Sequence, residues 1–332
     1  MSEPRLHVLG IGNAIVDVLA HAEDSFLVDQ KIEKGAMTLI DAARAQEIYS
    51  AMAPAIEISG GSAANTMVGI ASLGGKAGYT GKVRDDQLGE VFAHDIRAAG
   101  VTFSTPPASD GPPTARCLIL VTPDAQRSMN TFLGASSGLA ATDLDRDLIE
   151  SASITFMEGY LFDRPPAREA FFEAANIAHK AGRQVALTLS DPFCVDRYRA
   201  EFRRLVKEGV DILFANEQEI TSLYEVADFD RALQHVRQDC RLAALTRSEK
   251  GSIILRGDEV HVIDAEPVTK VVDTTGAGDL YAAGVLFGLA RNLDPATCGR
   301  LGSLAAAEVI GHFGARPETP LQTLAACAGL LA

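Results

Sequence analysis

The sequence lacks a long hydrophobic run and has few basic residues. No apolar stretch approaches the roughly 18 residues that a helix needs to cross a bilayer, which argues against a transmembrane span. Thirty Lys and Arg stand against 44 Asp and Glu, so the formal net charge is −14. Because this excess of anions repels a phosphodiester backbone or an anionic membrane surface, we expect neither nucleic acid nor a membrane as a partner.

Cysteine is also scarce. The five cysteines are odd in number and too far apart to form a CxxC pair: Cys117, Cys194, Cys240, Cys298 and Cys327. This argues against a disulfide framework and a structural zinc site, and it favours reduced, mostly core residues. Residues 1–4 have no basic-then-apolar leader, so we expect a cytoplasmic protein. The absence of GxxxxGK[ST] excludes a P-loop enzyme, and the absence of HRD and DFG in suitable context excludes the protein-kinase machinery.

What is present is enough apolar sequence for a substantial core, since 47% of the 332 residues are hydrophobic. Short β-rich runs are predicted at 6–12, 116–121, 153–157, 185–189, 211–214, 242–246 and 252–256. Helical patterns lie between many of them, at 87–99, 167–180, 228–238 and 278–291. This alternation predicts an α/β protein with a central, mainly parallel sheet and helices on both faces.

Two stretches, 14–41 and 101–133, fit the alternation less well. They contain β-like runs and turn residues without intervening helices, and we interpret them as a small β lid. The sequence shows no fixed-period repeat, low-complexity tract or long linker. We therefore expect a single domain, 1–332, from which the lid is an excursion.

The sharpest motif is the nonapeptide Val-Val-Asp-Thr-Thr-Gly-Ala-Gly-Asp at 271–279, which precedes an apolar helical pattern. Gly276 and Gly278 carry no side chain that would keep a ligand from the backbone, and the first N–H groups of a helix have no intrahelical partner. Such a turn can hold an anion. Asp279 falls in the first helical turn, where the helix dipole favours the ionised form that a general base requires. The alternative is a capped glycine turn in which Asp279 only complements the dipole.

The whole nonapeptide resembles the C-terminal signature of the ribokinase-like (PfkB-type) sugar and nucleoside kinases, and this resemblance implies a ribokinase-like fold. It implies ATP and Mg²⁺ as cofactors. It further implies that Asp279 deprotonates the acceptor hydroxyl while the backbone of Gly276, Ala277 and Gly278 receives the charge of the transferring phosphoryl group. Thr274, in the same run, is assigned to the nucleotide.

Two N-terminal segments extend the resemblance. Residues 58–66 contain Gly60, Gly61 and Asn65, which in the family hold the sugar; a tight turn with a Ser62 cap is the alternative. Residues 12–17 resemble the opening of the adenosine kinases more than that of ribokinase proper. This assigns Asn13, Ile15 and Asp17 to the substrate, with the Asp17 carboxylate accepting hydrogen bonds from two vicinal ribose hydroxyls.

The resemblance also supplies cation and nucleotide sites. Asn216 and Glu219 form the family's Asn-x-x-Glu arrangement, in which Glu219 organises magnesium through water; a helix N-cap followed by a first-turn Glu is the alternative. Thr246 is assigned to the nucleotide. Asp273, Thr275 and the region 309–318 resemble the loops that bind K⁺ in ribokinase relatives, with plain loop chemistry as the alternative.

Three segments point to a nucleoside. Strand alternation in 127–133 predicts one face carrying Arg127, Met129, Thr131 and Leu133. This run resembles the adenosine-kinase strand whose Arg approaches the γ-phosphate and whose apolar residues line the nucleoside; an ordinary lid strand is the alternative. Tyr160 and Phe193 align with the two aromatic walls of the family's purine site, although either ring could instead be core. The sequence departs from the family at Thr188, where Asn is more common, and at Arg84, where many relatives have Gly.

The functional hypothesis is therefore phosphorylation of the 5′-hydroxyl of a purine nucleoside, adenosine first, with a lid that closes over the nucleoside. The runner-up is a kinase of the same family acting on another nucleoside or a free sugar such as ribose, fructose or 2-keto-3-deoxygluconate. Three further hypotheses compete with a kinase: a hydrolase with Ser136 in Gly134-x-Ser136-x-Gly138, a dinucleotide-binding protein with Gly10-x-Gly12, and a non-catalytic nucleoside-binding protein. A monomer and a homodimer are both compatible with the sequence.

Overall fold

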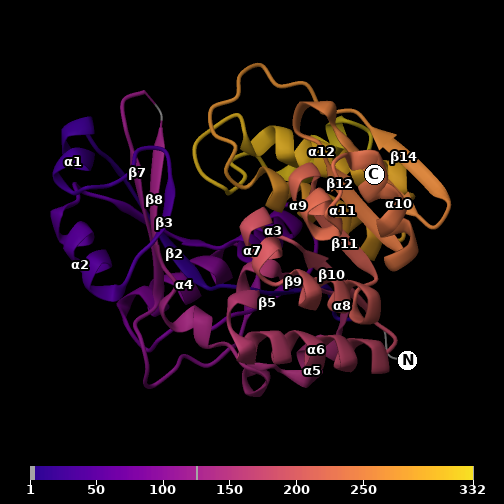
Figure 1. Ribbon diagram of the computed structural model, residues 1–332, viewed down its shortest axis with the longest axis horizontal. Coiled ribbons are helices and arrows are strands. Elements are labelled where there is room, and N and C mark those ends of the chain that lie inside the picture. Colours follow the sequence, from indigo (N-terminus) through magenta and orange to yellow (C-terminus); the bar gives the residue numbers. More distant parts are fainter. Residues whose placement is uncertain (1–3, 125, 332) are drawn as a thin grey trace.

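The computed structural model describes residues 4–124 and 126–331 and contains two β-sheets (Figure 1). The larger sheet has nine strands, in the spatial order β14 (Glu259–Ile263), β13 (Ser252–Arg256), β12 (Leu242–Thr246), β11 (Ile212–Asn216), β10 (Gln184–Thr188), β9 (Ala152–Glu158), β1 (Leu6–Ile11), β5 (Ala77–Thr80) and β6 (Thr102–Phe103). The strands from β12 to β6 pair in parallel, and only β13 and β14 are antiparallel. The predicted mainly parallel sheet is confirmed.

Helices cover both faces of this sheet, because its central strands are apolar on both sides. On one face lie α3 (Ser62–Ser72), α4 (Gln87–Ala98), α11 (Ala277–Ala290), α12 (Pro295–Val309) and α13 (Leu321–Cys327). On the other lie α5 (Arg146–Glu150), α6 (Pro165–Lys180), α7 (Pro192–Arg197), α8 (Arg199–Gly209), α9 (Glu217–Tyr224) and α10 (Phe229–Asp239). Within β9, Phe156 joins the first apolar cluster and Met157 the second, as the two-residue period of a strand requires.

The smaller sheet has five strands, in the order β3 (Met37–Leu39), β8 (Arg127–Phe132), β7 (Ala115–Val121), β2 (Ile15–His21) and β4 (Ile56–Gly60). Helices α1 (Asp24–Asp29) and α2 (Ala42–Ala51) accompany it at one end of the molecule (Figure 1). Val16 and Val18 of β2 join the main apolar cluster with α1 and α2. The opposite face carries a small separate cluster, with Cys117 and Ile119 of β7 beside Met129 of β8.

The structure corrects the description of the two lid segments. The range 14–41 is not free of helix, since α1 lies inside it, and β6 in the range 101–133 pairs with the large sheet. β4 and α2, outside both predicted ranges, belong with the smaller sheet. The reason is that strand pairing is non-local: β4 is a short run that becomes a sheet edge only by pairing antiparallel with β2.

Three short 3₁₀ helices, η1 (Gly134–Gly138), η2 (Ala141–Asp143) and η3 (Gly159–Asp163), join elements near the carboxyl edge of the large sheet, and η4 (Ser248–Lys250) joins β12 to β13. All five cysteines are free, as predicted. Within 4–124 and 126–331, no helix combines the length and the apolar character that crossing a membrane would require.

After β1 the order of the large sheet reverses, since β5 lies on one side of β1 and β9 on the other. In open α/β sheets this switch point, at the carboxyl ends of the strands, is where ligands bind.

Candidate active site

The predicted anion loop, formed by residues 273–278, leads into helix α11. Gly276 is the N-cap in the left-handed conformation, with φ of 80°, and a Cβ there would lie 2.7 Å from the Ala315 Cβ. A Cβ on Gly278 would meet nothing within 4 Å, so that side of the loop is open. The Ala277 N–H donates to the Thr274 carbonyl at 3.2 Å, which leaves the next amides of the helix to face a ligand.

Asp279 is fixed by the first turn of α3, more than 200 residues away in sequence. The Ser62 hydroxyl donates to its Oδ1 at 2.6 Å, and the Asn65 amide donates to its Oδ2 at 3.0 Å. Burial raises the pKa of Asp279, while these two hydrogen bonds and the charge of Arg316 act in the opposite direction. The Asn65 Oδ1 is buried and has no hydrogen-bond partner among the described residues. This orphan acceptor, beside a carboxylate, suits a hydroxyl group.

Gly60, the last residue of β4, and Gly61, the N-cap of α3, form a double-glycine turn. Gly61 has φ of 100°, and a Cβ there would lie 2.2 Å from the Asn13 carbonyl oxygen; a Cβ on Gly60 would lie 2.3 Å from Oδ2 of Asp17. Both positions therefore exclude a side chain. The Asp17 carboxylate, on β2, lies across this turn, and burial raises its pKa to about 6, although Arg316 and Arg127 act against the rise.

A buried carboxylate lies beneath the turn. Glu158, 1% exposed at the end of β9, accepts from the Ala63 N–H at 2.9 Å and from the Asn13 side chain at 2.8 Å. Ser136 donates to the Asn13 Oδ1 at 2.8 Å. Asn13, assigned to the substrate from the sequence, is thus 2% exposed with both ends of its amide engaged inside the protein. Burial raises the pKa of Glu158 to about 7.

Arg127 comes from β8 and reaches the loop before α11. It forms an ion pair with Asp273, and its Nη1 donates to the Thr275 hydroxyl at 2.9 Å. Its Nε and Nη2 are buried and have no hydrogen-bond partner among the described residues. Donors of a fixed cation that are buried without acceptors fit an anionic ligand such as a phosphate.

The surroundings of Asp273 bear on the predicted K⁺ site. One Asp273 oxygen accepts from the backbone and hydroxyl of Thr275 at 3.0 and 2.8 Å, and the other accepts from the Gly314 N–H at 3.0 Å and pairs with Arg127. Donors, rather than a set of free oxygens, therefore surround Asp273. Within the described residues, no three His, Cys, Asp or Glu side chains converge on a metal position. The K⁺ site stays a prediction without structural support.

Asn216 and Glu219 form the capping box at the start of α9. The Asn216 Oδ1 accepts from the Glu219 N–H at 2.8 Å, and the Glu219 carboxylate accepts from the Asn216 backbone at 2.9 Å and its amide at 2.7 Å. This is the local alternative that the sequence allowed. Glu219 is 6% exposed, and burial raises its pKa to about 7. Thr246, at the end of β12, pairs in register with Asn216, so these residues share one edge of the sheet.

The smaller sheet presents the predicted apolar face. Ile15 and Met129 pack against the small cluster around Cys117, and the Thr131 hydroxyl donates to the Cys117 sulfur at 3.2 Å. These residues share the face that carries Asp17 and Arg127, because side chains alternate along β2 and β8. Leu133 lies beyond the end of β8, at the N-cap of η1.

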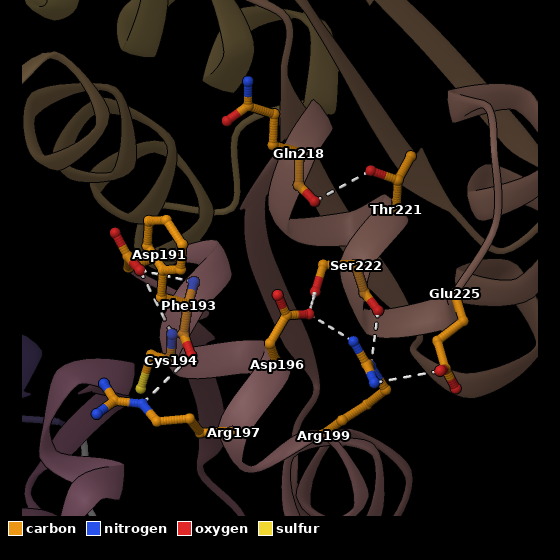
Figure 2. A network of polar contacts seen from close by, with 10 residues as sticks. All are labelled: Asp191, Phe193, Cys194, Asp196, Arg197, Arg199, Gln218, Thr221, Ser222 and Glu225. Carbon is orange, nitrogen blue, oxygen red and sulfur yellow. Dashed lines mark hydrogen bonds and ion pairs between the residues drawn. The ribbon is translucent and has the colours of Figure 1, made fainter.

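The two aromatic residues are exposed, not core. Phe193 is 76% exposed and Tyr160 38% exposed. Figure 2 shows Phe193 at the start of α7, where its N–H donates to Asp191 at 2.7 Å. The segments that carry the two rings are neighbours, since the Cys194 thiol contacts the Gly159 carbonyl at 3.4 Å.

Polar contacts brace α7 against α9 (Figure 2). Asp196 accepts from Arg199 at 2.5 Å and from the Ser222 hydroxyl at 2.6 Å, and Arg199 also donates to the Ser222 carbonyl at 2.9 Å. Arg197 forms an ion pair of 3.3 Å with Asp163, the last residue of η3. These contacts therefore hold α7, which carries the exposed Phe193, in a fixed position.

The family model of the pfkB carbohydrate kinases matches residues 30–322. The chain belongs to this family. The structure of the adenosine kinase from Sinorhizobium meliloti is 56% identical, with a TM-score of 0.90 over 98% of this chain and 99% of that one. That of a "probable sugar kinase" from Rhizobium etli is 52% identical, with a TM-score of 0.92 over 99% and 100%. The adenosine kinase of Saccharomyces cerevisiae is 26% identical over 338 residues, which cover 95% of this chain and 97% of its own.

Two contributors to the site of this kinase were missed from the sequence. Glu158 is an isolated acid at a strand end, and Arg316 is a single basic residue in the region 309–318, which was considered only for a cation. Arg316 donates to the backbone on both sides of the double glycine. The signal for Glu158 was its position directly after an apolar strand, where a buried acid needs partners that only the fold supplies.

Two of the competing interpretations, the hydrolase and the dinucleotide-binding protein, find no support in the geometry. Ser136 is fully buried in η1 and donates to Asn13 and to the Leu133 carbonyl, so it does not sit on an exposed strand–helix elbow. β1 is followed directly by β2, whereas a dinucleotide fingerprint requires a helix after Gly12.

Proposed function

We propose that this kinase transfers the γ-phosphoryl group of ATP to the 5′-hydroxyl of a purine nucleoside, with adenosine as its preferred acceptor. The observation that carries the proposal is the contact of Asp279 with Ser62 and Asn65, which joins the anion loop to the double-glycine turn. A base and a hydroxyl-binding turn thus lie directly beside the start of α11.

In the proposed reaction, Asp279 accepts the proton of the 5′-hydroxyl as that oxygen bonds to the γ-phosphorus. The bond from the γ-phosphorus to the β,γ-bridging oxygen breaks, and ADP leaves. The backbone of residues 276–278 and the unpaired donors of Arg127 are suited to the charge on the transferring group. Asp17, across the Gly60 backbone, would accept hydrogen bonds from the two ribose hydroxyls.

Magnesium neutralises phosphate charge in such a transfer. The described residues offer it no cluster of acids, so a magnesium ion would depend on the phosphates and water for most of its ligands. Glu219 would act through water, because both of its oxygens already accept hydrogen bonds from Asn216. The family's role for this residue is compatible with its capping box.

The exposed aromatic pair supports a nucleoside over a free sugar. Tyr160 and Phe193 leave large apolar surface in water, which a purine base would cover at little entropic cost. The similarity to the adenosine kinase from Sinorhizobium meliloti agrees with this assignment. The "probable sugar kinase" of comparable identity makes a free sugar the alternative to test.

The decisive experiment compares phosphorylation of adenosine, inosine, guanosine, ribose, fructose and 2-keto-3-deoxygluconate by the same preparation. We expect adenosine to have the highest kcat/KM. A clear preference for any free sugar would refute the nucleoside assignment.

The variant Phe193→Ala sharpens this test, because it should raise the KM for adenosine about 5-fold or more while the KM for ATP stays within 2-fold. Removing one stacked aromatic wall costs on the order of 1–3 kcal/mol of base binding. Val262→Ala is the matched control, since Val262 is 70% exposed on β14, the outermost strand of the large sheet and outside both lid segments. An equal rise in the KM for adenosine in the two variants would count against binding of the purine ring at Phe193.

A further inference from the structure

Arg316 lies in the loop that follows α12, and its guanidinium spans the double-glycine turn. The Nη2 group donates to the Ser59 carbonyl at 2.5 Å and to the Ser59 hydroxyl oxygen at 2.9 Å, while Nη1 donates to the Ala64 carbonyl at 3.3 Å. Ser59 precedes the turn and Ala64 follows it. One planar group therefore ties the end of β4 to the first turn of α3.

The strand side of this contact is itself fixed. Ser59 is fully buried, and its N–H and hydroxyl donate to Asp95 of α4 at 2.8 and 2.5 Å. The Ser59 hydroxyl thus donates to Asp95 and accepts from Arg316. Because the cation and the carboxylate hold the same serine from two sides, the entry to the turn has little freedom to shift.

The turn held by Arg316 carries the groups that meet Asp279 and Asp17. Ser62 and Asn65 donate to the two oxygens of Asp279, and a Cβ on Gly60 would collide with the Asp17 carboxylate. Arg316 also follows Ala315, which packs on Gly276 of the anion loop. The double-glycine turn and the anion loop are therefore linked through Ala315 and Arg316.

We propose that Arg316 is a positioning residue that fastens the double-glycine turn at both ends and holds it in register with Asp279 and the anion loop. This inference rests on the proposed function for the identity of the acceptor. A second contribution is electrostatic: among the groups around Asp279, Asp17 and Glu158 are acids, Tyr160 is neutral, and Arg316 is the cation whose charge lowers the pKa of both Asp279 and Asp17.

The test uses Arg316→Lys and Arg316→Gln, with Arg97→Gln as the matched control. Arg97 also donates to a backbone carbonyl, that of Phe103 at 2.9 Å, from the last turn of α4. Lys keeps the charge but cannot reach both ends of the turn with a planar fork, whereas Gln loses the charge as well.

We expect both Arg316 variants to raise the KM for adenosine about 10-fold or more and to leave the KM for ATP within 3-fold. Only Arg316→Gln should move the acid limb of the kcat profile to higher pH, because loss of the cation raises the pKa of the base. A KM for adenosine within 2-fold of wild type in both variants, with an unmoved pH profile, would overturn the proposal.

Hydrogen exchange over residues 56–66 supplies a readout that does not depend on the substrate. Both Arg316 variants should exchange faster there than wild type and Arg97→Gln, even if adenosine is not the acceptor. Failure of wild type to phosphorylate adenosine would refute the proposed function alone. Unchanged exchange over 56–66 in both variants would refute the role of Arg316 alone.

Discussion

Replacement of Asp279 by Asn separates chemistry from folding, because the surrounding hydrogen bonds can survive the change. In the wild type, Oδ1 accepts from Ser62 and Oδ2 accepts from Asn65. In Asp279→Asn, the amide oxygen can still accept from Asn65, and the new NH₂ can donate to Ser62, whose hydroxyl can reverse its role. The shape of the site is kept, and only the proton acceptor is lost.

The size of the effect follows from these contacts. A positioned base contributes about 10²–10⁴-fold to a rate, equivalent to roughly 3–5 kcal/mol of barrier, so kcat should fall by at least 10²-fold. Affinity for adenosine should stay within a few-fold. Because burial raises the pKa of Asp279, the ionised carboxylate costs stability at neutral pH, and the neutral amide should be at least as stable as the wild type.

Single-turnover kinetics, calorimetric titration with adenosine and thermal unfolding on one preparation measure all three quantities. Asp294→Asn is the control, because Asp294 caps α12 by accepting from the Thr297 N–H at 3.0 Å and lies on no part of the proposed site. Near-normal turnover of Asp279→Asn would refute the assignment of the base. A loss of turnover accompanied by unfolding would contradict the predicted exchange of hydrogen bonds.

Two further outcomes follow from the buried acid and from the lid. The pKa of Glu158 rises from 4.5 to about 7 on folding, so the folded protein binds this proton more tightly; the associated stability is complete below pH 4.5 and is lost as the pH rises through 7. Urea unfolding between pH 5 and pH 8 should therefore show a fall in stability of up to about 3 kcal/mol from this group, which Glu158→Gln removes; parallel curves for the two proteins would refute it. Hydrogen exchange in 14–41 and 101–133 should slow when adenosine binds, because a closed lid excludes water from the transferring phosphoryl group; identical exchange with and without adenosine would count against closure.

Much of the architecture followed from local patterns. The alternation of β-rich runs with helical runs predicted the parallel sheet, since residues two apart share a strand face and residues three or four apart share a helix face. The motif at 271–279 predicted a loop that opens a helix, and α11 begins there at Ala277. The Asn216–Glu219 spacing allowed a capping box, and that box is present. Each of these sequence patterns lies within a few neighbouring residues.

Strand pairing could not be obtained in the same way. The stretches 14–41 and 101–133 were recognised as departures from the strand–helix alternation and interpreted as a β lid. Nothing local indicated that β4 would join β2 or that β6 would extend the large sheet. The energy of such pairing comes from which faces are buried together, and that depends on closing long loops.

The sequence by itself determined the alternation of strands and helices and the glycine loop at the start of α11, because periodicity and turn chemistry act within a few residues. Only the tertiary structure decided which polar groups meet. Asp279 reaches Ser62 across 217 residues, and Arg316 reaches Ser59 across 257. Buried polar groups need partners at hydrogen-bond distance, and those partners come into reach only when distant segments pack together.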